Sequence, residues 1–314
     1  MHNSAPMPQS PPYPQADHAH LRPELRSTRL NLGCGRRYRT DWTNADLFSA
    51  DPSVLSIDLR YPLPVADARF GLVYHSHVLE HLDAAAGQQL LRECCRILAP
   101  GGTIRVVVPD LELLAAWYLQ ALSAAAGSPG VSTATRLTAI DPAALLRHRW
   151  AASMIIDQCA RDSSGGDLAH LWSDSTSLKA DAWLAPKSGL EMHGLAAQID
   201  GQPSSLPPLS PPRKSLSRRL RESLAKRLLG RAETHALRIG RFRLAGESHK
   251  FMYDRLSLAS ALTLAGFSSI TVHTAASTST DLFDPAGLDT DLAGAVYKPE
   301  SLFIEARKPR GHTA

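Results

Sequence analysis

One short segment near the start of the chain, Leu30–Gly35 with the sequence LNLGCG, limits the possible folds more than any other. An apolar strand that opens onto Gly33 and Gly35 lets the backbone turn without Cβ atoms, so a ligand can lie against the main chain. Asp46 follows eleven positions beyond Gly35. A carboxylate that ends a second strand can accept two hydrogen bonds from a ribose diol. The segment therefore predicts the cofactor edge of a nucleotide-binding α/β fold.

Residues 28–122 show the alternation of strands and helices that such a fold requires. Apolar residues recur at helical spacing over Val78–Leu98, and a Pro-Gly-Gly sequence at residues 100–102 stops this helix. The apolar run Leu111–Ala126 predicts a buried helix. The expected strands are residues 30–32, 43–47, 54–59, 70–74 and 104–108. A parallel crossover normally needs a dozen or more residues, so the first two crossover helices are expected to be single turns or absent. This alternation predicts a doubly wound, mostly parallel sheet.

The glycine turn and Asp46 are followed by Asp58, by the block HSHVLEHL at residues 75–82 and by LAPGGTIRVVVPD at residues 98–110. This order resembles the class I S-adenosylmethionine-dependent methyltransferases, in particular their small-molecule, type 11-like branch with its VLEH block and LxPGG turn. The resemblance covers residues 28–117 and resumes in the tail. It implies S-adenosyl-L-methionine as the cofactor.

The tail of the chain completes the fold that the resemblance implies. After residues 249–254 it carries a helical sequence at 256–267 and two closing strands at 269–273 and 301–308. In similar enzymes this tail supplies the last helix and an antiparallel hairpin. The expected fold is therefore α/β, a Rossmann-like doubly wound and mostly parallel sheet with a C-terminal antiparallel hairpin and a large helical insertion.

The implied cofactor site has eight candidate residues along the expected carboxyl edge of the sheet. They are Asn31, Gly33, Cys34, Gly35, Asp46, Asp58, His75 and His77. Asp58, at the end of the expected third strand, faces the adenine in similar enzymes, and its simpler interpretation is a cap at a strand end. The chain departs from the family pattern at Asn31, where an acidic residue is common, and at Arg37, where a third glycine is common.

The chain is expected to hold one methyltransferase domain interrupted by an insertion. The first 27 residues are polar and proline-rich, without an apolar secretory signal, and are expected to be disordered. Four cysteines without metal-binding spacing favour a reducing, cytoplasmic setting. The expected boundaries are 1–27 for the N-terminal segment, 28–122 and 246–309 for the methyltransferase domain, 123–245 for the insertion, and 310–314 for the tail.

Three residues are candidates for a catalytic role: His249, His77 and Asp110. His249 lies four residues before Tyr253, so the two share a face if this segment is helical. A histidine there can take a proton from a hydroxyl as a methyl group arrives, because its ordinary pKa is near neutrality. Asp110, directly after the fifth expected strand, is a similar candidate. The simpler interpretation of His249 is a hydrogen bond at the start of a helix.

The sequence His77-Val78-Leu79-Glu80-His81 also spells H-x-x-E-H, a zinc-ligand pattern of some metallopeptidases. A zinc peptidase needs that motif inside a long helix with a further ligand from another helix, whereas here it directly follows a strand. An ion held by His77, Glu80 and His81 as helical neighbours is a second alternative. We expect instead that Glu80 and His81 form caps and hydrogen bonds at the sheet edge, and that no metal binds.

Positive charge is concentrated in residues 213–243, which carry eleven Lys or Arg against Glu222 and Glu233, whereas the whole chain has a net charge of +4. Leucines recur every fourth residue from Leu216 to Leu228, which predicts an amphipathic basic helix over residues 216–229. The helix either packs through its leucines or contacts an anionic membrane surface, in which case salt releases it. Nucleic acid is disfavoured, because only Phe242 interleaves the charges.

The expected function is transfer of a methyl group to a small-molecule or glycan-like acceptor, by O-methylation. The alternatives are a non-catalytic cofactor-binding scaffold that docks through its basic helix and, less favoured, a nicotinamide-dependent oxidoreductase, since GCGRRY lacks the third glycine of the dinucleotide pattern. The insertion either forms an aromatic pocket for a sugar or makes a small separate core. The residues that would line this pocket or form this core are Trp150, His170, Trp172, Trp183 and His193.

Overall fold

The computed structural model describes residues 27–126, 141–173, 181–199, 228–244 and 246–310. Its centre is a seven-stranded sheet in the order β3-β2-β1-β4-β5-β7-β6. The strands are β1 (Arg29–Leu32), β2 (Thr43–Asp46), β3 (Val54–Ser56), β4 (Phe70–Ser76), β5 (Leu98–Pro109), β6 (Ser268–His273) and β7 (Ser301–Arg307). The first five are parallel, and β7 runs antiparallel to β5 and β6. The predicted Rossmann-like sheet with its antiparallel hairpin is confirmed.

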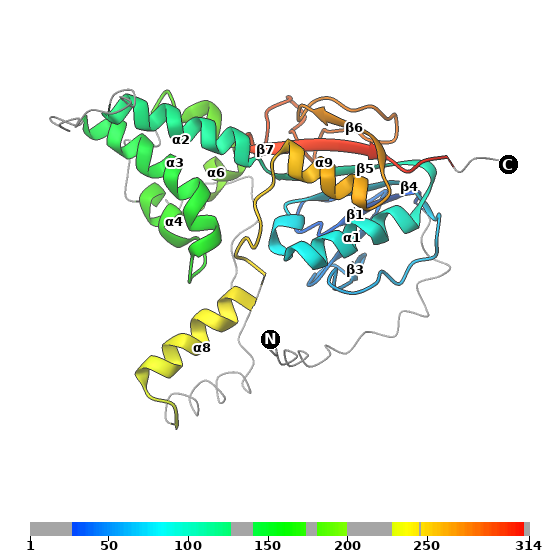
Figure 1. Ribbon diagram of the computed structural model, residues 1–314, viewed down its shortest axis with the longest axis horizontal. Helices are drawn as coiled ribbons and strands as arrows, with labels where there is room; N and C mark the ends of the chain where they lie inside the picture. The colour runs from blue at the N-terminus through cyan, green and yellow to red at the C-terminus, as the bar shows by residue number, and fades with distance from the viewer. Residues whose placement is uncertain (1–26, 127–140, 174–180, 200–227, 245, 311–314) are drawn as a thin grey trace, which may run out of the picture.

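Two helices, α1 (Ala84–Ile97) and α9 (Arg255–Leu264), cover one face of the sheet (Figure 1). Their apolar sides, which include Leu91 of α1 and Leu258 of α9, share one buried core with the strands. The opposite face of the sheet carries Leu72, Tyr74 and Phe303. These side chains pack against Phe283 and its neighbours, which precede β7. Because alternate residues of a strand point to opposite faces, both faces of β4 are buried.

The helical pattern predicted over Val78–Leu98 is divided in the structure into a short 3-10 turn, η2 (Leu79–His81), and helix α1. The division follows from Asp83, which has an extended backbone and accepts a hydrogen bond from the Ala86 N–H at 2.9 Å. Such a cap begins a new helix. Between β1 and β2 and between β2 and β3, all within the described residues, there is no helix. The expected absence of these two crossover helices is confirmed.

Two strand boundaries differ from the prediction. Strand β3 ends at Ser56, because Asp58 enters a turn in which its carbonyl oxygen accepts the Tyr61 N–H at 3.2 Å. Strand β5 begins at Leu98, so the Pro-Gly-Gly sequence lies within the strand. Gly101 has a φ of +79°, which glycine adopts without strain, and the pairing with β4 is irregular nearby.

The insertion forms a separate helical body beside the sheet, together with the helix that precedes it (Figure 1). Its described helices are α2 (Leu111–Ala126), α3 (Pro142–Ala160), α4 (Gly166–Ser173) and α6 (Ala185–Ile199). Trp150 and Trp172 are fully or almost fully buried in its core. This arrangement favours the separate core over an aromatic pocket for these two tryptophans.

The prediction that Leu111–Ala126 is a buried helix is correct in its bounds and wrong in its burial. Only Leu114 and Ala121 of α2 are buried, and the Leu119 side chain is exposed. The helix lies at the outside of the helical body and packs on α3 along one side. Helix α2 therefore carries apolar residues on all sides but is buried on only one side.

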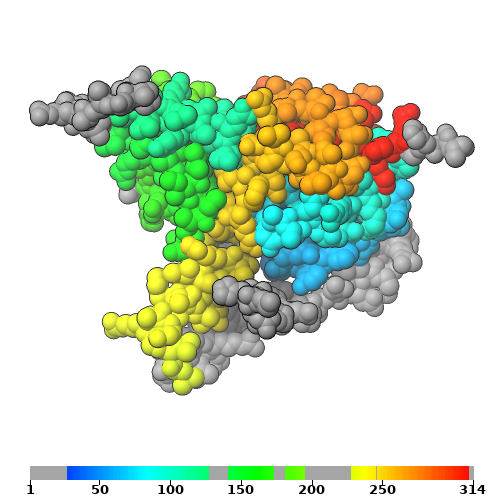
Figure 2. All heavy atoms as spheres, in the orientation of Figure 1, coloured from blue at the N-terminus to red at the C-terminus, as the bar shows by residue number. Residues whose placement is uncertain are grey.

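Helix α8 (Arg231–Leu244) projects from the rest of the molecule and has no buried residue (Figure 2). The basic helix predicted over residues 216–229 lies outside the described residues apart from its last two positions. The N-terminal segment up to residue 26 and the last four residues also lie outside them. No helix of the described ranges is long and apolar enough to cross a membrane.

Candidate active site

The strand order reverses between β1 and β4, and in open α/β sheets ligands bind at the carboxyl edge beside such a point. The chain places its predicted cofactor residues there. Gly33 follows β1, Asp46 ends β2, and His75 lies at the end of β4, paired with Leu32 of β1. The sheet thus brings three sequence-distant candidates to one edge.

The glycine turn is required by the backbone and by its neighbours. Gly33 and Gly35 have φ values of +62° and +54°. A Cβ atom on Gly33 would lie 2.3 Å from Cγ2 of Val78, whereas one on Gly35 would meet nothing within 4 Å. Gly33 therefore permits close packing of the turn on the segment after β4. Gly35 leaves open space at the edge, as close approach of a ligand to the main chain requires.

Asp46 holds the turn closed. Its Oδ2 accepts the Gly35 N–H at 2.8 Å, and its Oδ1 accepts the Phe48 N–H at 3.2 Å. Each oxygen keeps a further acceptor position, so the carboxylate can also bind a diol. The turn is further fixed by buried Asn31, whose Nδ2 donates to the Arg37 carbonyl oxygen at 3.3 Å. Burial raises the pKa of the Cys34 thiol to about 12, so this thiol is unreactive at neutral pH.

Arg37, which replaces a third glycine, joins the cofactor turn to the insertion. Its guanidinium lies 3.1 Å from the carboxylate of Glu191 on α6 and 3.7 Å from the centre of the Tyr297 ring. Lys298 also pairs with Glu191, at 3.4 Å. The departure from the family pattern therefore has a structural explanation: the arginine holds the insertion and the loop before β7 against the turn.

Asp58 lies beyond the end of β3 and binds Arg60, with the closest pair of atoms 2.6 Å apart. Burial by itself raises the pKa of Asp58, but the hydrogen bonds from Arg60 outweigh it and the pKa is lowered. The carboxylate is therefore ionised and partly occupied by an arginine. Its contact with the adenine stays a prediction.

His75 and His77 occupy different environments although they are two residues apart. His75 is fully buried, and neither of its ring nitrogens has a hydrogen-bond partner among the described residues. Burial lowers the pKa of His75 to about 4, so the ring is neutral at pH 7. The ring of His77 bridges two groups: Nε2 lies 2.9 Å from the Ser301 hydroxyl, and Nδ1 lies 3.0 Å from Oε1 of Glu80.

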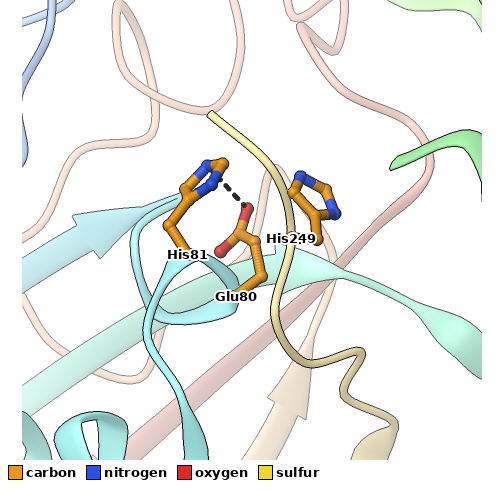
Figure 3. A group of neighbouring side chains, drawn as sticks. All are labelled: Glu80, His81 and His249. Atoms are coloured by element: carbon orange, nitrogen blue, oxygen red, sulfur yellow. Dashed lines mark ion pairs between the residues drawn. The ribbon is translucent and has the colours of Figure 1, made fainter. Parts of the chain in front are cut away.

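Glu80, His81 and His249 form a buried cluster at the same edge (Figure 3). The predicted capping role of Glu80 and His81 is wrong, because turn η2 has no side-chain cap. Oε1 of Glu80 contacts Nδ1 of His77, whereas Oε2 of Glu80 and Nδ1 of His81 have no hydrogen-bond partner within the described part of the chain. Burial acts to raise the pKa of Glu80, but the surrounding histidines hold it at about 2, so the carboxylate is ionised.

His249 reaches this cluster from a non-helical segment, so the condition for its sharing a face with Tyr253 is not met. Residues 249–254 precede α9, and Tyr253 pairs with Asp110 in an isolated bridge. His249 and Tyr253 therefore do not share a helical face. Burial lowers the pKa of His249 to about 3, which makes it a weak proton acceptor. Its predicted role as a base is not supported by this environment.

Asp110 and Glu300 lie together where β5 ends and β7 begins. The Asp110 N–H donates to the Glu300 carbonyl oxygen at 2.9 Å, and the Asp110 carboxylate accepts the Glu112 N–H at 3.0 Å at the start of α2. Burial raises the pKa of Asp110, and it raises the pKa of Glu300 to about 7. The sequence analysis missed Glu300, since only the antiparallel direction of β7 brings its first residues to this edge.

One family model matches part of this chain. Residues 38–106 match a family model described as a methyltransferase domain. No curated protein matches the sequence.

Solved structures of similar fold include several methyltransferases at 11–15% sequence identity. A methyltransferase from Archaeoglobus fulgidus, dependent on S-adenosylmethionine, is 12% identical, with 90% of this chain and 87% of that chain covered and a TM-score of 0.36. One from Mesorhizobium loti is 15% identical, with 89% of each chain covered and a TM-score of 0.32. The CurJ carbon methyltransferase is 11% identical, with 91% of this chain covered and a TM-score of 0.34, and this chain spans 50% of its length.

The five parallel strands, the antiparallel β7 and the glycine turn closed by an aspartate form a nucleotide-type α/β fold. Residues 38–106 are similar to the methyltransferase-domain family, and this match lies within the part of the chain that forms the parallel strands. This match implies S-adenosylmethionine, the predicted cofactor, as the methyl donor. The open space beside Gly35 and the free acceptor positions of Asp46 fit this cofactor.

Proposed function

We propose that this methyltransferase acts on a hydroxyl group of a small-molecule or glycan-like acceptor. The observation that carries the proposal is Glu300, a partly buried carboxyl at the carboxyl edge of the sheet with a pKa of about 7. A general base works best when its pKa is near the working pH. Hydroxyl acceptors need such a base, because their proton must leave as the new bond forms.

The surroundings of Glu300 support this role. Its backbone bonds to Asp110, and the next residue, Ser301, contacts His77 at the end of β4. The charged groups that act on its carboxyl are Lys298, which lowers the pKa, and Glu191, which raises it, with burial as the largest cause. The carboxyl therefore changes its charge near neutral pH, at the edge where the acceptor must meet the cofactor.

The bound cofactor supplies a methyl group that its sulfonium already activates, so the chain has to align the acceptor and remove one proton. When bound, the cofactor would supply its methyl group to the acceptor oxygen and keep the carbon–sulfur electron pair on sulfur. The Glu300 carboxylate would accept the proton that the acceptor hydroxyl loses.

The segment after β4 also supports an acceptor other than a nucleic-acid base. Base methyltransferases place an NPPY-like tetrapeptide after the fourth strand, and His75-Ser76-His77 occupies that place here. The insertion and the loop before β7, held to the turn by Arg37, provide the walls beside the edge. An acceptor site built from such inserts is specific to the individual enzyme.

The proposal is tested with the purified full chain, methyl-labelled S-adenosylmethionine and pooled small-molecule and glycan extracts. We expect labelled products in which the methyl group is bonded to oxygen, identified by mass spectrometry and NMR. Metabolites that lose a methyl group when the gene is deleted should include the natural acceptor. Products labelled only on nitrogen, carbon or sulfur would contradict the proposal.

The role of Glu300 is tested by Glu300→Gln, with exposed Glu112→Gln as the matched control. In the unaltered protein kcat should rise with pH through about 7 as Glu300 loses its proton. In Glu300→Gln we expect that rise to disappear and kcat to fall by about 100-fold or more, with cofactor affinity unchanged by calorimetry. An unchanged pH profile in Glu300→Gln would overturn the assignment of the base.

A further inference from the structure

Three potential metal-ligating side chains converge from two distant parts of the chain. Glu80 and His81 belong to η2, and His249 belongs to the extended segment after α8. Their ligand atoms all lie within 4.8 Å of one another, with the Glu80 carboxylate between the two rings (Figure 3). The centres of the His81 and His249 rings are 4.9 Å apart.

Most polar atoms of this cluster lack partners. Oε1 of Glu80 has Nδ1 of His77 at 3.0 Å, but Oε2 of Glu80, Nδ1 of His81 and Nδ1 of His249 are buried without a hydrogen-bond partner in the described residues. Glu80 has no exposed surface. Buried polar groups are nearly always satisfied, and a buried carboxylate with an unpaired oxygen is unfavourable. The cluster therefore has the features of a site that a ligand completes, and the ligand must be a cation.

The backbone fixes the two segments against each other. The N–H groups of Lys250 and Phe251 donate to the Glu80 carbonyl oxygen at 2.7 and 3.3 Å, and the His249 N–H donates to the Gln158 carbonyl oxygen at 2.9 Å. The three side chains therefore meet because of main-chain hydrogen bonds that do not involve the side chains themselves. This prearrangement is what a binding site requires.

We propose that Glu80, His81 and His249 bind a divalent transition-metal ion of the zinc class. Two imidazoles and one carboxylate form a three-ligand set that leaves one tetrahedral position open. Zinc bonds of 2.0–2.2 Å would place the ligand atoms about 3.4 Å apart, so small side-chain rotations are enough to close the site. Mg²⁺, which prefers oxygen ligands and keeps several waters, fits this set less well.

His77 contacts the proposed metal site without being one of its three ligands. Its Nδ1 lies 3.0 Å from Oε1 of Glu80, and such outer partners orient metal-ligating carboxylates. The sequence suggested His77, Glu80 and His81 as an alternative ligand set, and we expected no metal. The structure replaces His77 with His249 as the third ligand. Metal binding by Glu80, His81 and His249 does not depend on the identity of the methyl acceptor. Use of the open coordination position of the metal to hold an acceptor oxygen does rest on the proposed O-methylation.

The proposal is tested on the full chain, stripped with a chelator and then titrated with Zn²⁺ by calorimetry. We expect one Zn²⁺ per chain, a rise in the unfolding temperature, and visible absorption of a four-coordinate site when Co²⁺ is used instead. Glu80→Gln and His81→Gln should each weaken Zn²⁺ binding by about 100-fold or more, because each removes a direct ligand. His148→Gln, on the far part of α3, is the matched control and should bind as the unaltered protein does.

Circular dichroism of each variant confirms that it is folded, and the partly exposed His81 provides a substitution that the fold should tolerate. No saturable Zn²⁺ binding to the unaltered chain, or equal binding by the Glu80 and His81 variants, would overturn the site. Equal affinity for Mg²⁺ would overturn the zinc-class assignment. Metal binding and methyl transfer are measured separately, so failure of this proposal leaves the test of the proposed function intact.

Discussion

Two groups of buried charges lie in this molecule, and they differ in one respect. Arg105 on β5 pairs with Asp289 and Glu305, each at 2.8 Å, and all three side chains are almost fully buried. Glu80 is equally buried, beside His81 and His249. The first group is closed, because its members satisfy one another. The second is open, because one Glu80 carboxylate oxygen and the Nδ1 atoms of both histidines have no hydrogen-bond partner among the described residues.

In the closed group, the buried charges make hydrogen bonds that join parts of the fold. The Arg105 guanidinium also donates to the Ser277 and Thr274 carbonyl oxygens, and the Tyr74 hydroxyl donates to Asp289 at 2.7 Å. These contacts join β5 to the segment that covers that face of the sheet. A buried charge with all its hydrogen bonds made can hold a fold together, whereas an open one indicates a site.

The largest expected effect comes from opening the closed group. Arg105→Met leaves two buried carboxylates without their counter-ion and should lower the free energy of unfolding by about 3–5 kcal/mol. Arg243→Met removes an exposed ion pair to Asp162 and should change it by less than about 1 kcal/mol. Urea unfolding monitored by circular dichroism measures both. Similar costs for the two variants would show that the closed buried group does not stabilise the fold more than an exposed ion pair does.

The second prediction concerns the stability that the protein loses at low pH because of His75. The pKa of His75 is about 4 in the folded chain and 6.5 ordinarily, so the unfolded chain binds more protons between these values. Stability is therefore lost as pH falls from about 6.5 to 4, by about 3 kcal/mol from this residue alone. His75→Leu should remove that loss, seen as a flatter dependence of unfolding free energy on pH. The control, exposed His235→Leu, should keep the steeper dependence.

The smallest expected effect on stability is that of Gly35→Ala, which is compared with Gly33→Ala in the same turn. Gly33→Ala should lower the free energy of unfolding by about 3 kcal/mol, because the new Cβ clashes with Val78 in a left-handed backbone. Gly35→Ala meets no atom and should cost about 1 kcal/mol, yet it should weaken cofactor binding by filling the open space. Thermal unfolding and calorimetry measure the two quantities. Unchanged cofactor affinity in Gly35→Ala would show that the cofactor does not approach there.

Local patterns predicted the fold well. The glycine turn and Asp46 are joined by a hydrogen bond at 2.8 Å, as their spacing suggested. Helix α2 has the predicted bounds, and α9 begins after a capping box formed by Asp254 and Ser257. These features depend on residues close in sequence, on turn geometry and on helix caps, so they can be inferred without a model of the whole chain.

Long-range features could not be predicted in this way. Nothing near Arg105 in the sequence indicates that Asp289 and Glu305 satisfy its charge, and a buried arginine in an apolar strand has no local explanation. Whether His249 lies on a helix was left open, because spacing alone cannot tell a non-helical segment from a helical one. Glu300 was missed because the antiparallel direction of β7 was not used to place the start of this strand at the carboxyl edge of the parallel strands.

The sequence by itself determined the α/β class, the cofactor turn and the identity of most strands and helices, because hydrophobic periodicity and glycine geometry act over a few residues. The tertiary structure decided which distant side chains meet. It brought His249 to Glu80 and Glu300 to Asp110 through main-chain hydrogen bonds between segments far apart in the chain. The charge and reactivity of those groups follow from burial, and burial exists only once the chain has folded.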